Sequence, residues 1–351
     1  MTQALSNLTG ILPGYVVHRR VRLGASGTVT VPHNGKMAVL VTGAGGSGAR
    51  NVAASGNATG GGAGGQIMDM IDVAAGEVLT VTLGAPGAAV TGTTGSAAGN
   101  PGSASSLSGT FLGTAYSATI NGGGAGAAGG AGIGGGAGGT VTGGSSFAIK
   151  AAGGRAGNAL NSTASKATGG GGVNAFAGTD QTATRGGDIT SASNANLQAT
   201  GGGGCGGTGS DVTVTAASNS WGGGSGGSAG ADSSAQGPNW NGDWTTSSVS
   251  GAALMNLFGL DFYGGGGATL GGAGGSGGGG AAGAGGTPGG AGGRFGGGAA
   301  AHANGATPTV AGDGNVGGGG GAAVGTSGQT MTSGRGGYAE AIVVFLKPIQ
   351  G

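Results

Sequence analysis

The stretch GGAGGSGGGGAAGAGGTPGGAGGR, residues 271–294, has glycine at every third position, from Gly271 and Gly274 to Gly289 and Gly292. Collagen shares this three-residue period, but it also needs about 15–20% proline, and here only Pro288 is present. The polyglycine-II helix also has three residues per turn, and it makes no internal hydrogen bonds. Its amide and carbonyl groups point outwards, so buried helices of this kind must bond to their neighbours. We therefore predict a bundle of short polyglycine-II helices packed side by side.

Glycine dominates the whole chain, at 101 of 351 residues, which is about four times its usual share. Together with 8 prolines, this composition is typical of disordered proteins. Disordered chains are usually highly charged, whereas only 7% of these residues are charged and the mean hydropathy is +0.12. We therefore predict an ordered chain in which backbone hydrogen bonds replace much of the usual side-chain core.

The charge pattern argues against several classes of partner. With 12 basic and 11 acidic residues, the chain lacks the clustered lysine and arginine of nucleic-acid-binding proteins. Its apolar runs are shorter than the roughly 20 residues of a membrane span, so we expect no membrane insertion, and the N-terminus lacks the apolar core of a secretory signal. Cys205 is the single cysteine, which excludes an intramolecular disulfide.

Strand-like sequences flank the glycine-rich region. Alternating, β-branched patterns occupy residues 28–43, 66–84 and 337–348. The Asn34-Gly35 pair predicts a hairpin between residues 28–32 and 36–43, and we expect the first and last strands to pair. The predicted fold class is all-β with irregular regions: antiparallel, sandwich-like strands at both ends enclose a bundle of polyglycine-II helices with long surface loops.

The first 22 residues differ from the rest, because they are richer in large apolar and basic side chains. We predict a docking segment at residues 1–22, followed by a glycine-rich domain at residues 23–351. The alternative is a frayed terminus with a few apolar residues. The residues predicted to dock are Leu8, Ile11, Leu12, Tyr15, Arg19 and Arg20.

Four segments leave the glycine pattern and are expected to form loops, at residues 88–116, 158–166, 179–198 and 216–263. The last holds six of the fourteen aromatic residues, including all three tryptophans. Exposed aromatic side chains beside polar ones are typical of sugar or protein recognition. The alternative is a small local core made of the apolar residues in this segment, Leu254, Leu257, Phe258 and Phe262. The predicted recognition residues are Trp221, Asn239, Trp240, Asn241, Asp243, Trp244 and Tyr263.

Catalytic chemistry has little support in the sequence. The three histidines lack a carboxylate at the spacing of a metal or triad motif. Asp69 and Asp72 are three positions apart in an alternating strand, so they should face opposite sides, and we interpret both as part of a solvated strand face. We expect no catalytic residue, no metal site, no cofactor and no enzymatic activity.

The motifs TVTVP (28–32), MAVLVTGAGGSG (37–48), IDVAAGEVLTVTLGAPG (71–87) and GGYAEAIVVFL (336–346) together resemble the glycine-rich domains of bacteriophage tail fibres and tail-tip adhesins. The resemblance covers roughly residues 24–347 and is compositional in the middle. It implies a virion protein, made in the host cytoplasm, whose N-terminal segment docks on other tail or fibre proteins. Its loops would contact a host receptor, an outer-membrane protein or polysaccharide, and a homotrimer is one possible assembly. The competing hypotheses are a structural virion subunit and, third, a depolymerase.

Overall fold

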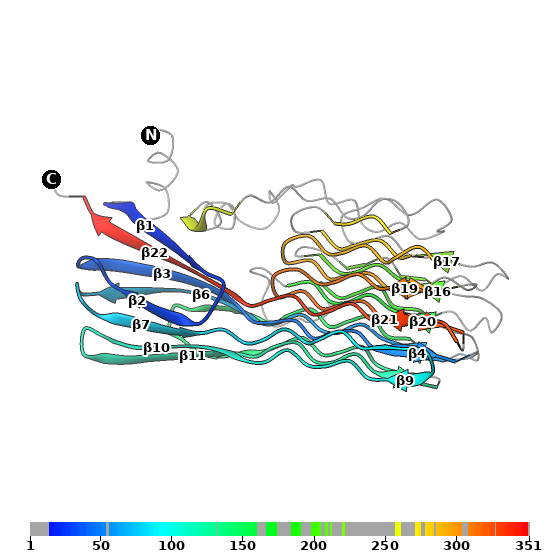
Figure 1. Ribbon diagram of the computed structural model, residues 1–351. Helices are drawn as coiled ribbons and strands as arrows, with labels where there is room; N and C mark the ends of the chain where they lie inside the picture. The colour runs from blue at the N-terminus through cyan, green and yellow to red at the C-terminus, as the bar shows by residue number, and fades with distance from the viewer. Residues whose placement is uncertain are drawn as a thin grey trace.

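The computed structural model describes residues 14–53, 56–130, 132–159, 166–173, 184–190, 198–204, 208–209, 211–212, 220–221, 257–260, 271–274, 278–283, 286–303, 308–326 and 328–349. The described chain is almost entirely β-structure and extended segments, with helix confined to a short turn at residues 257–258. The predicted all-β class is thereby confirmed. The molecule is elongated, with long strands at one end and short strands at the other (Figure 1).

Two five-stranded sheets form a sandwich at one end. The first sheet has the order β1-β22-β3-β6-β14, made of Tyr15–Leu23, Glu340–Pro348, Gly35–Thr42, Gln66–Val73 and Ile149–Ala151. The second has the order β13-β11-β10-β7-β2, made of Val141–Gly143, Thr114–Ile120, Ser105–Phe111, Val78–Thr82 and Gly27–Thr30. Strands from both ends of the chain therefore meet in one sandwich, because β22 pairs with both β1 and β3.

An ordinary hydrophobic core lies between these sheets. Alternate residues of each strand point into it, such as Val39 and Val41 of β3 and Leu79 and Val81 of β7, all of them buried. The strict alternation predicted for residues 78–84 is confirmed by the burial of β7. The opposite face of the first sheet is also apolar, since Leu40 of β3 packs there in a second core cluster with Phe258 and Phe295.

The hairpin predicted at Asn34-Gly35 is wrong. β2 pairs with β7 in one sheet, whereas β3 pairs with β22 and β6 in the other. Both strands carry valines that must reach the same core, and they do so from opposite sides. Glycine at position 35 instead allows β3 to lie close to the main chain of β22, because a Cβ atom there would lie 2.3 Å from the carbonyl oxygen of Leu346.

Glycine-rich segments, which we call rods, extend from the sandwich and form the bundle (Figure 1). Their hydrogen bonds run between rods with a period of three residues. In the rod at residues 60–65, successive amides donate to the carbonyls of three different neighbouring rods. Gly61 and Gly64 donate to one rod, at residues 320 and 317 respectively. Gly62 and Gly65 donate to a second, at residues 124 and 121, and Ala63 donates to a third, at residue 154. The donor–acceptor distances are 2.7–3.0 Å. Polyglycine-II helices are expected to show this pattern. We therefore keep the interpretation that the rods are polyglycine-II helices.

The same bonds continue across the bundle. One series of hydrogen bonds links seven rods. Each amide donates to the carbonyl of the next residue in the order 334, 321, 312, 299, 290, 281 and 272. The donor–acceptor distances are 2.8–3.0 Å. Backbone amides thus join segments that are far apart in the sequence. The loop predicted at residues 88–116 is wrong in part, because this segment contains short strands, β10 and the start of β11.

Candidate functional site

Short strands gather at the end of the bundle that lies opposite the sandwich, which we call the distal end (Figure 1). One sheet is β12-β5-β15-β16-β17, made of Ala128–Gly129, Asn57–Ala58, Lys166–Ala167, Gln198–Ala199 and Ser220–Trp221. The others are β18-β20-β4-β9, made of Ala301–His302, Ala323–Gly325, Arg50–Val52 and Gly95–Ala97, and β19-β21-β8, made of Thr309–Val310, Met331–Thr332 and Thr91–Gly92. Strands from many parts of the sequence therefore meet at one end of the molecule.

A buried polar layer lies within these short strands. Asn57, Lys166 and Gln198 stand in register on adjacent parallel strands, and all are buried. The Arg50 guanidinium donates to the carbonyl of Thr94 at 2.9 Å and so fixes the exposed reversal between β8 and β9. Such bonds hold the displayed main chain in one conformation.

Burial changes the proton affinity of two bases in this layer. It lowers the pKa of His302 to about 4, and hydrogen bonds involving the backbone at Ala303 and at His302 itself act in the opposite direction. Burial also lowers the pKa of Lys166. Within the described residues there is no group of three or more His, Cys, Asp or Glu side chains that could hold a metal ion.

The predicted recognition residues fall mostly outside the described part of the chain. Asn239, Trp240, Asn241, Asp243, Trp244 and Tyr263 lie outside the described residues. Trp221 lies in β17 at the distal end, where it is paired with Ala199. Leu257 and Phe258 are buried, which agrees with the alternative hypothesis that this segment forms a local core. Their packing partners, however, belong to the first sheet of the sandwich.

The predicted docking residues divide between two regions. Leu8, Ile11 and Leu12 lie outside the described residues, whereas Tyr15, Arg19 and Arg20 lie in β1. β1 is hydrogen-bonded along its length to β22, so this part of the segment belongs to the sandwich. The Arg20 side chain donates to the carbonyl of Leu257 at 2.8 Å and anchors the helical turn beside the strand.

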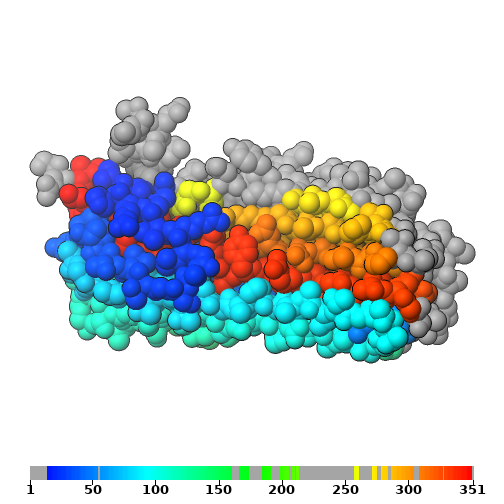
Figure 2. Space-filling model, viewed as in Figure 1, coloured from blue at the N-terminus to red at the C-terminus, as the bar shows by residue number. Residues whose placement is uncertain are grey.

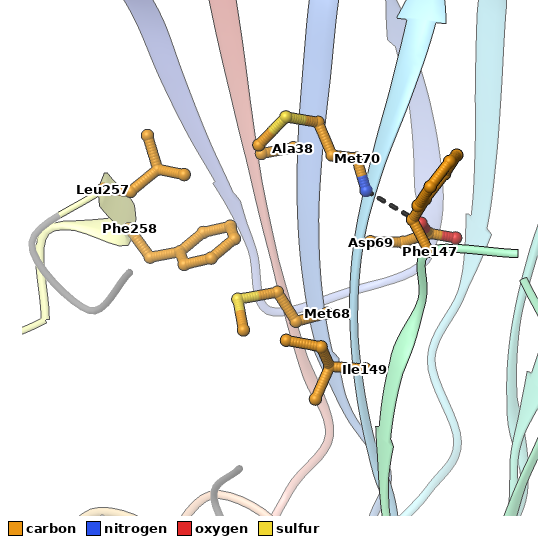
Figure 3. A pocket seen from close by; sticks show the side chains of 8 residues that line it. All are labelled: Ala38, Met68, Asp69, Met70, Phe147, Ile149, Leu257 and Phe258. Carbon is orange, nitrogen blue, oxygen red and sulfur yellow. Dashed lines mark hydrogen bonds between the residues drawn. The ribbon is translucent and has the colours of Figure 1, made fainter. Parts of the chain in front are cut away.

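The outer face of the first sheet carries an apolar pocket of about 180 Å³. Leu257 and Phe258 from the helical turn lie across from Met68 of β6, and Ile149 of β14 lies beside Met68 (Figure 3). The remaining lining residues are Ala38, Asp69, Met70 and Phe147. The Phe147 side chain is 83% exposed, so one wall presents a large apolar surface to solvent.

Asp69 organises the turn that carries Phe147. It is buried and accepts hydrogen bonds from the hydroxyl of Tyr116 at 3.1 Å, from the amide of Ser145 at 2.7 Å and from the hydroxyl of Ser145 at 2.5 Å. Asp69 and Asp72 do face opposite sides, but the interpretation of Asp69 as solvated is wrong. This site was not predicted from the sequence, where one phenylalanine in the polar turn between the glycines and β14 is its only signal.

The comparisons with known proteins assign the family. A model of the glycine-rich domain matches residues 21–228, more than half of the chain. The chain belongs to the glycine-rich domain family. No curated protein matches it significantly. The match to the glycine-rich domain begins within β1 and covers most of the sandwich together with the first rods of the bundle. No helix in the described residues of this glycine-rich protein is long and apolar enough to cross a membrane.

Proposed function

We propose that the protein is a receptor-binding component of a bacteriophage virion, in a tail fibre or at a tail tip, and that it recognises the host cell surface without catalysing a reaction. One observation carries the proposal: short strands from many rods gather at the distal end of the bundle, at the opposite end from the sandwich. Because the rods are bonded through their main chains, side chains at this end can vary without disturbing the scaffold. The motif resemblance to tail-fibre domains supports the same assignment.

The two ends of the molecule differ in structure, which suits attachment at one end and recognition at the other. β1 and β22 bring the two ends of the described chain to the sandwich. We propose that the sandwich end contacts other tail or fibre proteins, through residues 1–22 and the neighbouring sheet. The distal end would then face an outer-membrane protein or polysaccharide of the host. A trimer would place three distal ends side by side and raise the avidity for a repeated receptor.

A second candidate function is a structural virion subunit that contacts only other subunits. The apolar pocket beside the exposed Phe147 favours it, since a large exposed apolar surface often marks a contact with another protein. In that case the distal end would be covered in the assembled particle. The two functions therefore differ in which end of the molecule faces the solvent.

The test compares the predicted recognition segment with the sandwich end of the same protein. Trp240→Ala with Trp244→Ala removes the predicted recognition aromatics, and Phe147→Ala removes an aromatic side chain at the sandwich end. We expect purified protein carrying the tryptophan changes to lose binding to bacterial cells by about tenfold or more, because aromatic contacts often dominate binding energy, while the Phe147 variant still binds. Undiminished binding by the tryptophan variant would reject this loop as the recognition surface. Loss of particle incorporation by the Phe147 variant alone would favour the structural role.

A further inference from the structure

Two pockets adjoin each other where the sandwich meets the bundle. The first, of about 310 Å³, lies between β1 and the turn at residues 258–260 and is also lined by Arg294. The second, of about 330 Å³, crosses several rods and is lined by Gly292, Tyr338 and residues 313–315. Gly292 of the second pocket and Arg294 of the first are two residues apart, so the pockets are neighbours. In Figure 2 the N-terminal strands, the yellow turn and the C-terminal residues meet on this side of the molecule.

The first pocket has more positive than negative charge. Arg20, Arg22 and Arg294 line it, and Arg22 and Arg294 both donate to the Glu340 carboxylate, which is only 4% exposed. One buried carboxylate therefore accepts hydrogen bonds from two guanidinium groups. The Nε atom of Arg294 is buried without a hydrogen-bond partner, whereas the Arg22 side chain is 56% exposed. The exposed part of the Arg22 guanidinium therefore offers N–H donors to an incoming anion, whereas the Arg294 Nε is covered.

The second pocket adds another arginine and a flat ring. Arg335 and Asp313 form a loose pair, with 3.5 Å between Nη2 and Oδ2, and their side chains are 62% and 43% exposed. Such a pair is weak in water, so the Arg335 guanidinium can turn to a ligand at little cost. Tyr338 is 45% exposed and lines the same pocket.

Tyr338 links the two groups of arginines along the chain. It lies two residues before Glu340, whose carboxylate accepts from Arg22 and Arg294, and it lines the second pocket together with Arg335. The exposed ring, the buried carboxylate and Arg335 therefore belong to one segment, residues 335–340. We call this surface, made of Arg22, Arg294, Arg335 and Tyr338, the junction strip.

We propose that the junction strip binds an acidic glycan, with a pyranose ring stacked on Tyr338 and its carboxylate or phosphate held by the neighbouring arginines. Sugar rings present flat C–H faces that pack well on aromatic rings, and guanidinium groups bind carboxylate and phosphate with two parallel hydrogen bonds. A nucleic acid is a poorer fit, because phosphate tracking needs longer basic surfaces.

The junction strip contains no residue of the short strands at the distal end, so this inference does not depend on the proposed receptor contact. It gives the protein a second ligand. Loss of cell binding in the tryptophan variants would not decide the question, because the strip contains none of the changed residues. Conversely, failure of the junction strip to bind glycans would leave the distal proposal standing.

The experiment uses the full-length protein on an array of bacterial surface glycans that pairs carboxylated, phosphorylated and neutral forms of the same sugars. We expect binding to acidic members that weakens with added salt. Tyr338→Ala and Arg335→Ala should each weaken this binding about tenfold, while Tyr338→Phe, which keeps the ring, stays within about threefold of wild type. Phe147→Ala is the matched control, since it removes an exposed aromatic side chain elsewhere and should change nothing.

Several outcomes would overturn the proposal. These are binding to no acidic glycan, equal binding to neutral and acidic forms, and equal binding by wild type and Tyr338→Ala. Selective capture of an acidic peptide, with no glycan bound, would show that the junction strip is a protein contact instead. The carboxylated and phosphorylated members of the array distinguish the two anion sources. Thermal unfolding of each variant separates lost binding from lost folding, and Tyr338→Phe keeps the test valid if Tyr338→Ala does not fold.

Discussion

Gly62 illustrates, at the scale of one residue, why the bundle needs glycine. A Cβ atom at this position would lie 1.9 Å from the carbonyl oxygen of Ala137 and 2.4 Å from its carbonyl carbon. Both are backbone atoms inside the hydrogen-bonded network, so they cannot move aside without breaking bonds between rods. We predict that Gly62→Ala lowers the free energy of unfolding by about 3 kcal/mol or more, measured by denaturant or thermal unfolding.

Gly27 provides the matched control for this prediction. It lies in β2 of the sandwich, and a Cβ atom there would meet nothing within 4 Å. The change Gly27→Ala should therefore alter the free energy of unfolding by no more than about 0.5 kcal/mol. Equal effects of the two substitutions would mean that close approach between rods does not explain the glycine content.

Ion pairs link neighbouring rods at the scale of elements. Arg155 donates two hydrogen bonds to Asp188, both at 2.9 Å, and the amide of Asn158 donates to the same carboxylate at 2.7 Å. Burial alone would raise the pKa of Asp188, but these bonds and the charges of Arg185 and Arg155 outweigh it and lower that pKa. The carboxylate therefore stabilises the fold above the pKa of the unfolded chain, and this stability is lost as the pH falls below about 4.

We predict that Asp188→Asn destabilises the protein by about 3 kcal/mol at neutral pH, because it leaves the mostly buried Arg155 without its charge partner. The exposed Asp313 is the control, and Asp313→Asn should cost about 1 kcal/mol or less. Unfolding measured from pH 7 to pH 3 should show the difference between wild type and Asp188→Asn shrinking as Asp188 becomes protonated. A difference that stays constant with pH would contradict the electrostatic account.

The strands within residues 28–43, 66–84 and 337–348 were predictable as elements, but their partners were not, and β1, β10 and β11 were missed. Alternating burial in β7 follows directly from its sequence, since each apolar residue is two positions from the next. The placement of β2 and β3 in different sheets depends on contacts with β7 and β22, which no local pattern encodes. Asp69 was misjudged for the same reason, because its donors, Tyr116 and Ser145, come from distant segments.

At the scale of the whole molecule, the glycine period predicted laterally bonded rods, because the amides of a bare extended chain must bond outside it. The period could not predict that the sandwich and the short strands occupy opposite ends, since this depends on where each rod reverses. The junction strip was also beyond sequence reasoning. Arg22, Arg294 and Arg335 are separated by long glycine-rich segments, and only the assembled sandwich and bundle bring them to one surface.

The whole molecule should also have an unusual heat capacity of unfolding. Exposure of apolar surface raises this quantity and exposure of polar surface lowers it, and ordinary proteins show about 12–15 cal/mol/K per residue. The bundle buries mainly peptide groups, since its rods are held by backbone bonds between glycines and alanines. We therefore predict a heat capacity change below about 10 cal/mol/K per residue, obtained from calorimetric unfolding enthalpies at several melting temperatures set by pH. An all-β protein of similar length with an ordinary core is the control. If the protein gave the ordinary value instead, apolar side chains rather than main-chain amides would have to supply most of its buried surface.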